Sequence, residues 1–160
     1  HPYRWELKDA EGYCVLSSEG MMESLLDVAL TLKSPKLWWP HDHGVPYLYI
    51  SSFYLIDNNG EVIQSVKNKI GFRKVQLVMN EGAWDEPAEF PKTRSVPPAQ
   101  IELNGRKIFA KGTNWVNPEV FPGIITDERY RELLDIVVAT NFNIVRTWGG
   151  SIINKASFFE

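Results

Sequence analysis

The stretch that decides the fold is residues 126–150, TDERYRELLDIVVATNFNIVRTWGG. Its first part is typical of a helix, because Thr126 can cap the amino end and the acidic pair Asp127 and Glu128 suits the positive end of the helix dipole. The following residues recur at helical spacing, with an apolar side chain at all but the last: Tyr130, Leu133, Leu134, Val137 and Asn141. Residues 143–148 are typical of a short strand, so we predict a helix that leads directly into a strand.

The residues before this stretch predict a second strand. Residues 101–112, IELNGRKIFAKG, read as two short strands around Asn104-Gly105, a dipeptide that accepts the positive φ of a two-residue hairpin. Strand, loop, helix and strand form a β-α-β unit, so we expect residues 107–112 to pair in parallel with residues 143–148. One such unit cannot cover both faces of its sheet, and we therefore expect the natural protein to continue beyond residue 160.

Residues 1–80 predict an antiparallel β-sandwich, because short strands alternate with turn signals. We expect a mostly buried strand at residues 24–32, a strand at 48–57 that ends at the turn Asn58-Asn59-Gly60, and return strands at 61–72 and 73–80. Residues 81–100 contain four prolines and predict an extended linker. The predicted fold class is mainly β: an immunoglobulin-like sandwich, then a partial α/β segment at residues 101–160.

Composition excludes several classes of function. A net charge of −3 and a pI near 5.7 show no basic surplus, which argues against nucleic acid as a partner. We predict no membrane partner, since no apolar run approaches the ~18 residues of a span. His41 and His43 flank Asp42 and are usable metal ligands, but the chain offers no further histidine cluster. We therefore predict a solvated loop there and no metal site.

Candidate binding residues follow the two strands of the β-α-β unit, where ligands of such folds gather. The first strand leads to Asn114 and Trp115, and the second to Arg146, Trp148 and Gly149. Tryptophan can offer an apolar plane to a sugar ring, asparagine and arginine can bond its hydroxyl groups, and glycine lets the backbone approach. The alternative is structural: Arg146 forms an internal ion pair and Trp148 seals the barrel end.

Several motifs in the same order resemble glycoside hydrolase family 2. They are LWWPHDHGVPYLY, GFRKVQL, IELNGRKIFAKGTNW and FPGIITDERYRELLDIVVATNFNIVRTWGG, and the resemblance covers residues 25–160. The order is similar to the junction between that family's immunoglobulin-like sandwich and its (β/α)8 catalytic barrel. RTWGG and GTNW resemble the β-mannosidase-like branch, although Ser151 stands where many members carry a third glycine.

The resemblance implies a retaining hydrolase of terminal β-linked sugars, with β-mannosides as the expected substrates and no cofactor. It implies a catalytic acid/base and a nucleophile that are both glutamates beyond residue 160, so we expect this chain to lack catalytic residues and to be inactive alone. It leaves the compartment unknown; a secreted bacterial glycosidase would be periplasmic or extracellular. The alternatives are a β-galactosidase-like member and a non-catalytic carbohydrate-binding or adhesion module, which explains residues 1–80 but not the β-α-β unit.

An incomplete barrel also has a consequence for assembly. Without the remaining units, the apolar helix face and both edges of the two-stranded sheet would lack cover, and each large apolar side chain is worth ~1.5–3 kcal/mol when buried. Open strand edges recruit strands from neighbours, so we predict a homodimer through residues 101–160 as an artefact of truncation. The other outcome is that the unit packs onto the chain's own sandwich or linker.

Overall fold

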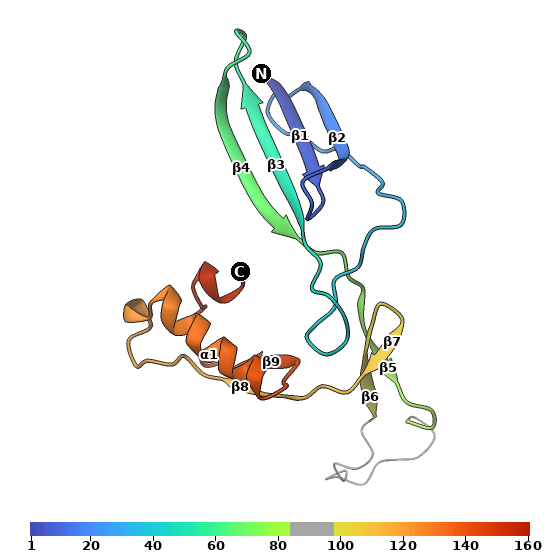
Figure 1. Ribbon diagram of the computed structural model, residues 1–160, viewed down its shortest axis with the longest axis vertical. Coiled ribbons are helices and arrows are strands. Elements are labelled where there is room, and N and C mark those ends of the chain that lie inside the picture. The colour runs from blue at the N-terminus through green and yellow to red at the C-terminus, as the bar shows by residue number, and fades with distance from the viewer. Residues whose placement is uncertain (84–97) are drawn as a thin grey trace. The chain divides into compact units, whose positions relative to one another are not determined.

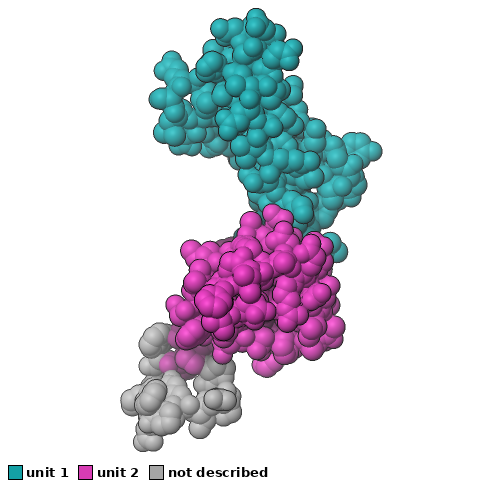
Figure 2. Space-filling model, turned by 90° about the vertical axis from the view of Figure 1, so that its left-hand side faces the viewer, with its two compact units in different colours: residues 1–39, 45–73 teal, residues 40–44, 74–160 magenta. Residues whose placement is uncertain are grey.

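The computed structural model describes residues 1–83 and 98–160. These residues form two compact units, the first made of residues 1–39 and 45–73, and the second of residues 40–44 and 74–160 (Figure 2). The limits of the units differ from the predicted domain limits at residues 80 and 101, so the domain division of the whole protein stays a prediction. Most of the predicted linker, residues 84–97, lies outside the described residues.

The first unit is built on a four-stranded antiparallel sheet in the order β2-β1-β3-β4 (Figure 1). Its strands are β1 Pro2–Lys8, β2 Cys14–Met21, β3 Tyr49–Ile56 and β4 Val62–Ile70. The predicted turn between β3 and β4 is confirmed: the Asp57 carboxylate accepts the backbone N–H groups of Asn59 and Glu61 at 2.8 Å each. Gly60 has a φ of 87°, which glycine adopts without steric cost.

The predicted buried strand at residues 24–32 is wrong. The segment forms no strand, and Leu25 is 84% exposed. Alternate residues of the segment nevertheless line an apolar hollow of about 430 Å³. They are Leu26, Val28, Leu30 and Leu32, and they face side chains of the sheet, Tyr3, Trp5, Leu7, Leu16 and Phe53, and Phe72, which follows β4. The alternation is that of a strand, but no neighbouring strand among the described residues supplies hydrogen bonds to the segment.

The second unit begins with an antiparallel sheet of three strands, β5 Val75–Met79, β6 Ala99–Leu103 and β7 Arg106–Ile108. We predicted β5 as a return strand of the sandwich, but it pairs with β6 in this unit. The predicted hairpin is confirmed, since Asn104 and Gly105 both have positive φ, 51° and 81°. With nine strands and one α-helix among the described residues, the mainly β class is confirmed.

The predicted parallel β-α-β arrangement is present, but its first strand lies further along the chain. β8 Gly112–Trp115 pairs in parallel with β9 Ile144–Thr147, and α1 Asp127–Ala139 lies between them in sequence. Residues 107 and 108, which we expected in this pairing as part of 107–112, belong to β7, the second arm of the hairpin. The Asn104-Gly105 turn folds them back onto β6, so the chain reaches the parallel sheet only at Gly112.

Helix α1 has both of its ends closed by local hydrogen bonds. Thr126 is the N-cap, as predicted, and its Oγ1 accepts the backbone N–H of Arg129 at 3.2 Å. At the other end Asn141 adopts a φ of 63°. Its N–H donates to Val138 O at 2.9 Å, and the N–H of Phe142 donates to Val137 O at 3.1 Å, which is a Schellman motif. Asn141 therefore ends the helix instead of continuing its periodicity.

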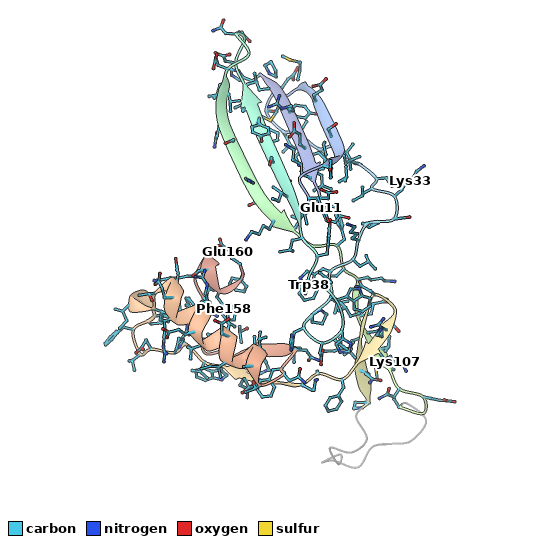
Figure 3. The ribbon with its side chains drawn as sticks, viewed as in Figure 1. Glu11, Lys33, Trp38, Lys107, Phe158 and Glu160 are labelled. Carbon is cyan, nitrogen blue, oxygen red and sulfur yellow. The ribbon has the colours of Figure 1, made fainter. Side chains whose placement is uncertain are left out.

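A small aromatic core fills the space between α1 and the parallel pair. Trp115, Ile125 and Tyr130 are buried, and Leu133, Leu134, Val145 and Phe158 pack against them. Phe158, labelled in Figure 3, comes from the short 3₁₀ helix η2 Ala156–Phe158, and its ring lies 4.8 Å from that of Trp115. The expectation of an uncovered helix face is therefore wrong for Tyr130, which is 1% exposed.

Candidate functional site

Asn114 and Arg146 lie opposite each other across the parallel pair β8–β9. The Arg146 guanidinium donates from Nη1 to Asn114 Oδ1 at 3.2 Å. Side chains of alternate strand residues share a face, so Gly112 and Ile144 lie on the same side of the pair. Together with Ala110 and Thr113, these four residues line an open hollow of about 420 Å³, which we call the β8–β9 hollow. The structure thus brings two of the predicted site residues into contact.

Trp115 occupies the opposite face of β8, and its predicted role as a sugar-binding plane is not supported. Its side chain is 6% exposed, and its ring packs with those of Tyr130 and Phe158. Neighbouring residues of a strand point to opposite faces, so Asn114 and Trp115 cannot both face one ligand. Reading GTNW as a strand, rather than as a loop after a strand, would have revealed this from the sequence.

Trp148 remains accessible, with 51% of its surface exposed. It follows β9, and its backbone N–H donates to the carbonyl oxygen of Trp115 at 2.9 Å. A Cβ added at Gly150 would lie 2.6 Å from the Trp148 ring, whereas nothing lies within 4 Å of the corresponding position at Gly149. Gly150 therefore makes room for the ring, and the backbone at Gly149 is open to approach, the property for which we selected it.

Sequence reasoning missed the polar residues that connect the segments after β8 and β9. Asn154 is 7% exposed, and its Oδ1 accepts from Trp115 Nε1 at 3.2 Å. The Asn117 side chain forms two hydrogen bonds with the backbone of Ile152: its Oδ1 accepts the Ile152 N–H at 3.1 Å, and its Nδ2 donates to the Ile152 carbonyl oxygen at 3.3 Å. Isolated asparagines in a loop carry no pattern, so no sequence signal could have found them.

The His41-Asp42-His43 motif lies in the clasp loop, residues 40–44, which belongs to the second unit. Most of the loop is exposed, in line with the expected solvated loop, but its polar groups are also paired: Asp42 pairs with Lys111 and accepts from Asn143 Nδ2 at 3.4 Å. His41 Nε2 and Asn141 Oδ1 lie 3.1 Å apart, and Arg106 donates to the His43 carbonyl oxygen at 3.2 Å. Lys111 and Asn143 immediately precede β8 and β9, so the clasp loop binds the ends of these strands away from Trp148.

The clasp loop changes the titration of its carboxylate. The hydrogen bond from Lys111 holds the pKa of Asp42 below its usual value, and the bond from Asn143 and the positive charge of Lys111 act in the same direction. Desolvation of the Asp42 carboxylate opposes them. Asp42 therefore stays ionised, and the pair with Lys111 intact, at pH values where an ordinary carboxyl group begins to take up protons.

No group of three or more His, Cys, Asp or Glu side chains within residues 1–83 and 98–160 is arranged to hold a metal ion. Across the same ranges, no helix has the length and apolar character needed to cross a membrane.

Comparison with known proteins identifies the family. The family model for glycosyl hydrolases family 2 matches residues 5–73. β-Mannosidase A of Aspergillus clavatus is 31% identical over 154 residues, which cover 89% of this chain and 16% of that protein. The chain belongs to glycosyl hydrolase family 2. This family 2 chain is also 33% identical to the Bos taurus β-mannosidase over 123 residues, 77% of the chain and 13% of the relative.

A solved structure supports the same assignment. The crystal structure of the β-D-mannosidase from Dictyoglomus thermophilum superimposes on this family 2 chain with a TM-score of 0.79 and 29% sequence identity, covering 99% of the chain and 18% of that protein. The predicted resemblance to the β-mannosidase-like branch is confirmed. The chain spans about a sixth of the length of the curated relatives that it matches.

Proposed function

We propose that this chain is part of a retaining β-mannosidase, and that Asn114, Arg146, Trp148 and Gly149 contact the terminal sugar. The observation that carries the proposal is the hydrogen-bonded pair Arg146–Asn114 on the open face of the parallel strands. The similarity to β-mannosidases from three organisms supports the choice of sugar.

The chemistry of these side chains suits a neutral, hydroxyl-rich ligand. Arg146 has five N–H donors and uses one on Asn114 among the described contacts, so others can donate to sugar hydroxyl groups. The contact with Arg146 also fixes the orientation of the Asn114 amide. Trp148 keeps about half of its surface exposed and can stack on the C–H face of a sugar ring. Among the described residues, none with an acidic side chain lines the β8–β9 hollow.

Hydrolysis with retention needs a general acid and a nucleophilic carboxylate about 5–5.5 Å apart. We propose that other strands of the same (β/α)8 barrel supply both carboxyl groups, and that the described residues bind and orient the sugar. On this proposal the β-α-β segment within residues 101–160 begins the catalytic barrel, the β1–β4 sheet within residues 1–80 belongs to a preceding sandwich domain, and the chain alone does not hydrolyse glycosides.

The proposal is tested with two proteins, this chain and the full-length protein that carries it. We expect the full-length protein to hydrolyse 4-nitrophenyl β-mannoside in preference to the β-galactoside and β-glucuronide, with the β-anomer of mannose as the first product seen by proton NMR. The chain alone should release no nitrophenol above a mock-purified control. Preference for another sugar would refute the choice of substrate, an α-anomer would refute the mechanism, and turnover by the chain alone would refute its inactivity.

A further inference from the structure

Three hydrogen-bond donors converge on one buried oxygen atom in the second unit. Asn154 Oδ1 accepts from Trp115 Nε1 at 3.2 Å, from Asn117 Nδ2 at 3.4 Å and from the Tyr130 hydroxyl at 3.4 Å. An indole N–H can only donate, so the Asn154 atom that faces it is the oxygen and not the nitrogen of the amide. The orientation of this amide is therefore determined by its partners.

The donors come from separate parts of the fold. Trp115 ends β8, Asn117 lies in the segment that follows β8, and Tyr130 lies in α1. Asn154 itself belongs to the segment between β9 and η2. Asn117 also forms two hydrogen bonds with the Ile152 backbone. The segments after β8 and β9 are therefore connected at two neighbouring residues, Ile152 and Asn154.

This connection leads directly to the sugar-contacting residues. Trp115 directly follows Asn114 in the chain, and the carbonyl oxygen of Trp115 accepts the backbone N–H of Trp148. A displacement of Trp115 would therefore move the end of β8, and with it the Asn114 amide that accepts from Arg146. We propose that Asn154 is a positioning residue: its buried oxygen holds the ends of β8 and β9 so that Asn114, Arg146 and Trp148 meet one ligand. The identity of that ligand rests on the proposed function.

Two substitutions at Asn154 distinguish the effect of the hydrogen-bond acceptor from the effect of the side chain's shape. Asn154→Leu keeps the branched shape of the side chain but removes the acceptor of two buried donors, the Trp115 indole and the Tyr130 hydroxyl, and of the half-buried Asn117 amide. Loss of the acceptor of a buried donor costs more than the loss of an exposed hydrogen bond. Asn154→Asp keeps the shape and offers a carboxylate that accepts from all three donors. The proposal therefore requires the leucine variant to disturb the site and the aspartate variant to preserve it.

The direct test is NMR on the chain itself. The indole N–H signal of Trp115 is assigned with Trp115→Phe, and its exchange with water is compared in wild type, Asn154→Asp and Asn154→Leu. A net hydrogen bond contributes about 0.5–1.5 kcal/mol and a tenfold change corresponds to about 1.4 kcal/mol, so we expect up to roughly tenfold faster exchange in the leucine variant. The Asn114 side-chain amide and the Trp148 backbone amide should shift in Asn154→Leu and stay near their wild-type positions in Asn154→Asp. Asn58→Leu, in the exposed β3–β4 turn, is the control.

Unchanged Trp115 exchange and unchanged Asn114 signals in Asn154→Leu would overturn the proposal, as would equal disturbance by both variants. If Asn154→Leu does not fold, Asn117→Ala replaces it. That variant removes both hydrogen bonds to the Ile152 backbone. The proposal then requires the NMR signal of the Trp148 backbone amide to shift together with that of the Ile152 amide. A shift confined to Ile152 would refute it.

A second readout uses the full-length protein. Small displacements of a positioning residue can cost about a hundredfold in rate, so we expect kcat/KM on a β-mannoside to fall by about that factor in Asn154→Leu and to recover in Asn154→Asp. Equal kcat/KM in wild type and Asn154→Leu would contradict the positioning role. A wild-type protein without β-mannosidase activity would refute the proposed function, and the NMR comparison would still decide the role of Asn154.

Discussion

The substitution Gly112→Ala should destabilise the parallel pair β8–β9, although it adds only one methyl group. Gly112 opens β8 and lies opposite Ile144 in the parallel pair. A Cβ added there would lie 1.9 Å from the Ile144 carbonyl oxygen and 2.7 Å from its Cγ2. The backbone at Gly112 does not have positive φ, so the conformation suits alanine and only space is lacking.

The size of the effect follows from the geometry. Ordinary contact begins at 3.4 Å, so Gly112→Ala needs the two strands to part by about 1.5 Å, the difference between 3.4 and 1.9 Å. The obstructing atom is backbone and cannot rotate away. Overpacking costs ~1–3 kcal/mol, and we expect about 3 kcal/mol here because the paired strand itself must move. That corresponds to a roughly hundredfold loss of protection against hydrogen exchange in β8 and β9.

Amide hydrogen exchange followed by NMR measures this loss residue by residue. The matched control is Gly123→Ala, since nothing lies within 4 Å of its added Cβ and its φ is not positive. We expect Gly123→Ala to leave β8 and β9 at wild-type protection, and Gly112→Ala to leave the β1–β4 sheet unaffected. Wild-type protection of β9 in Gly112→Ala would refute the close approach of the two strands and the register from which it follows.

Three further predictions address other parts of the chain. The pKa of Asp42 is lowered in the folded chain, so its contribution is present above the unfolded pKa of about 3.9 and is lost as pH falls through the lower folded value. Hydrogen exchange, corrected for its intrinsic pH dependence, should therefore show constant protection at the starts of β8 and β9 down to about pH 5 and a loss below about pH 4, and Asp42→Asn should remove this dependence. Gly150→Ala should displace the Trp148 ring and change its fluorescence, whereas Gly149→Ala should not; equal spectra would show that Gly150 does not support the ring. Light scattering should find the chain dimeric at tens of micromolar, and a monomer would show that the chain covers its own open strand edges.

The parts of the fold that could be predicted from sequence are those set by local chemistry. The helix was predictable because its N-cap, acidic first turn and apolar spacing lie within one short stretch, and the hairpin because Asn104-Gly105 alone suits its turn. The partner of a strand is not a local property. β5 has the same strand pattern whether it pairs within the sandwich or with β6, and only the structure shows which.

In the candidate site, too, some residues could be predicted from the sequence and others could not. Asn114 and Arg146 were predictable as neighbours because parallel strands end on one side of a sheet. Trp115 was expected in a loop after the strand, whereas it is the last residue of β8, so its side chain lies on the face opposite to that of Asn114. Asn154 could not be found, since its role depends on donors from β8, the following segment and α1 that meet only in the folded chain.

The most direct test of the account is the effect of Arg146→Ala on β-mannoside hydrolysis by the full-length protein. Arg131→Ala, on the exposed side of α1, is the matched control. Removal of a hydrogen-bond donor aimed at the reacting sugar costs ~10²–10³-fold in rate, so kcat/KM should fall by at least about a hundredfold in Arg146→Ala. In Arg131→Ala, kcat/KM should remain at the wild-type value. The melting temperature should be unchanged in both variants. A kcat/KM in Arg146→Ala equal to that of wild type would contradict the assignment of the β8–β9 hollow as the sugar site.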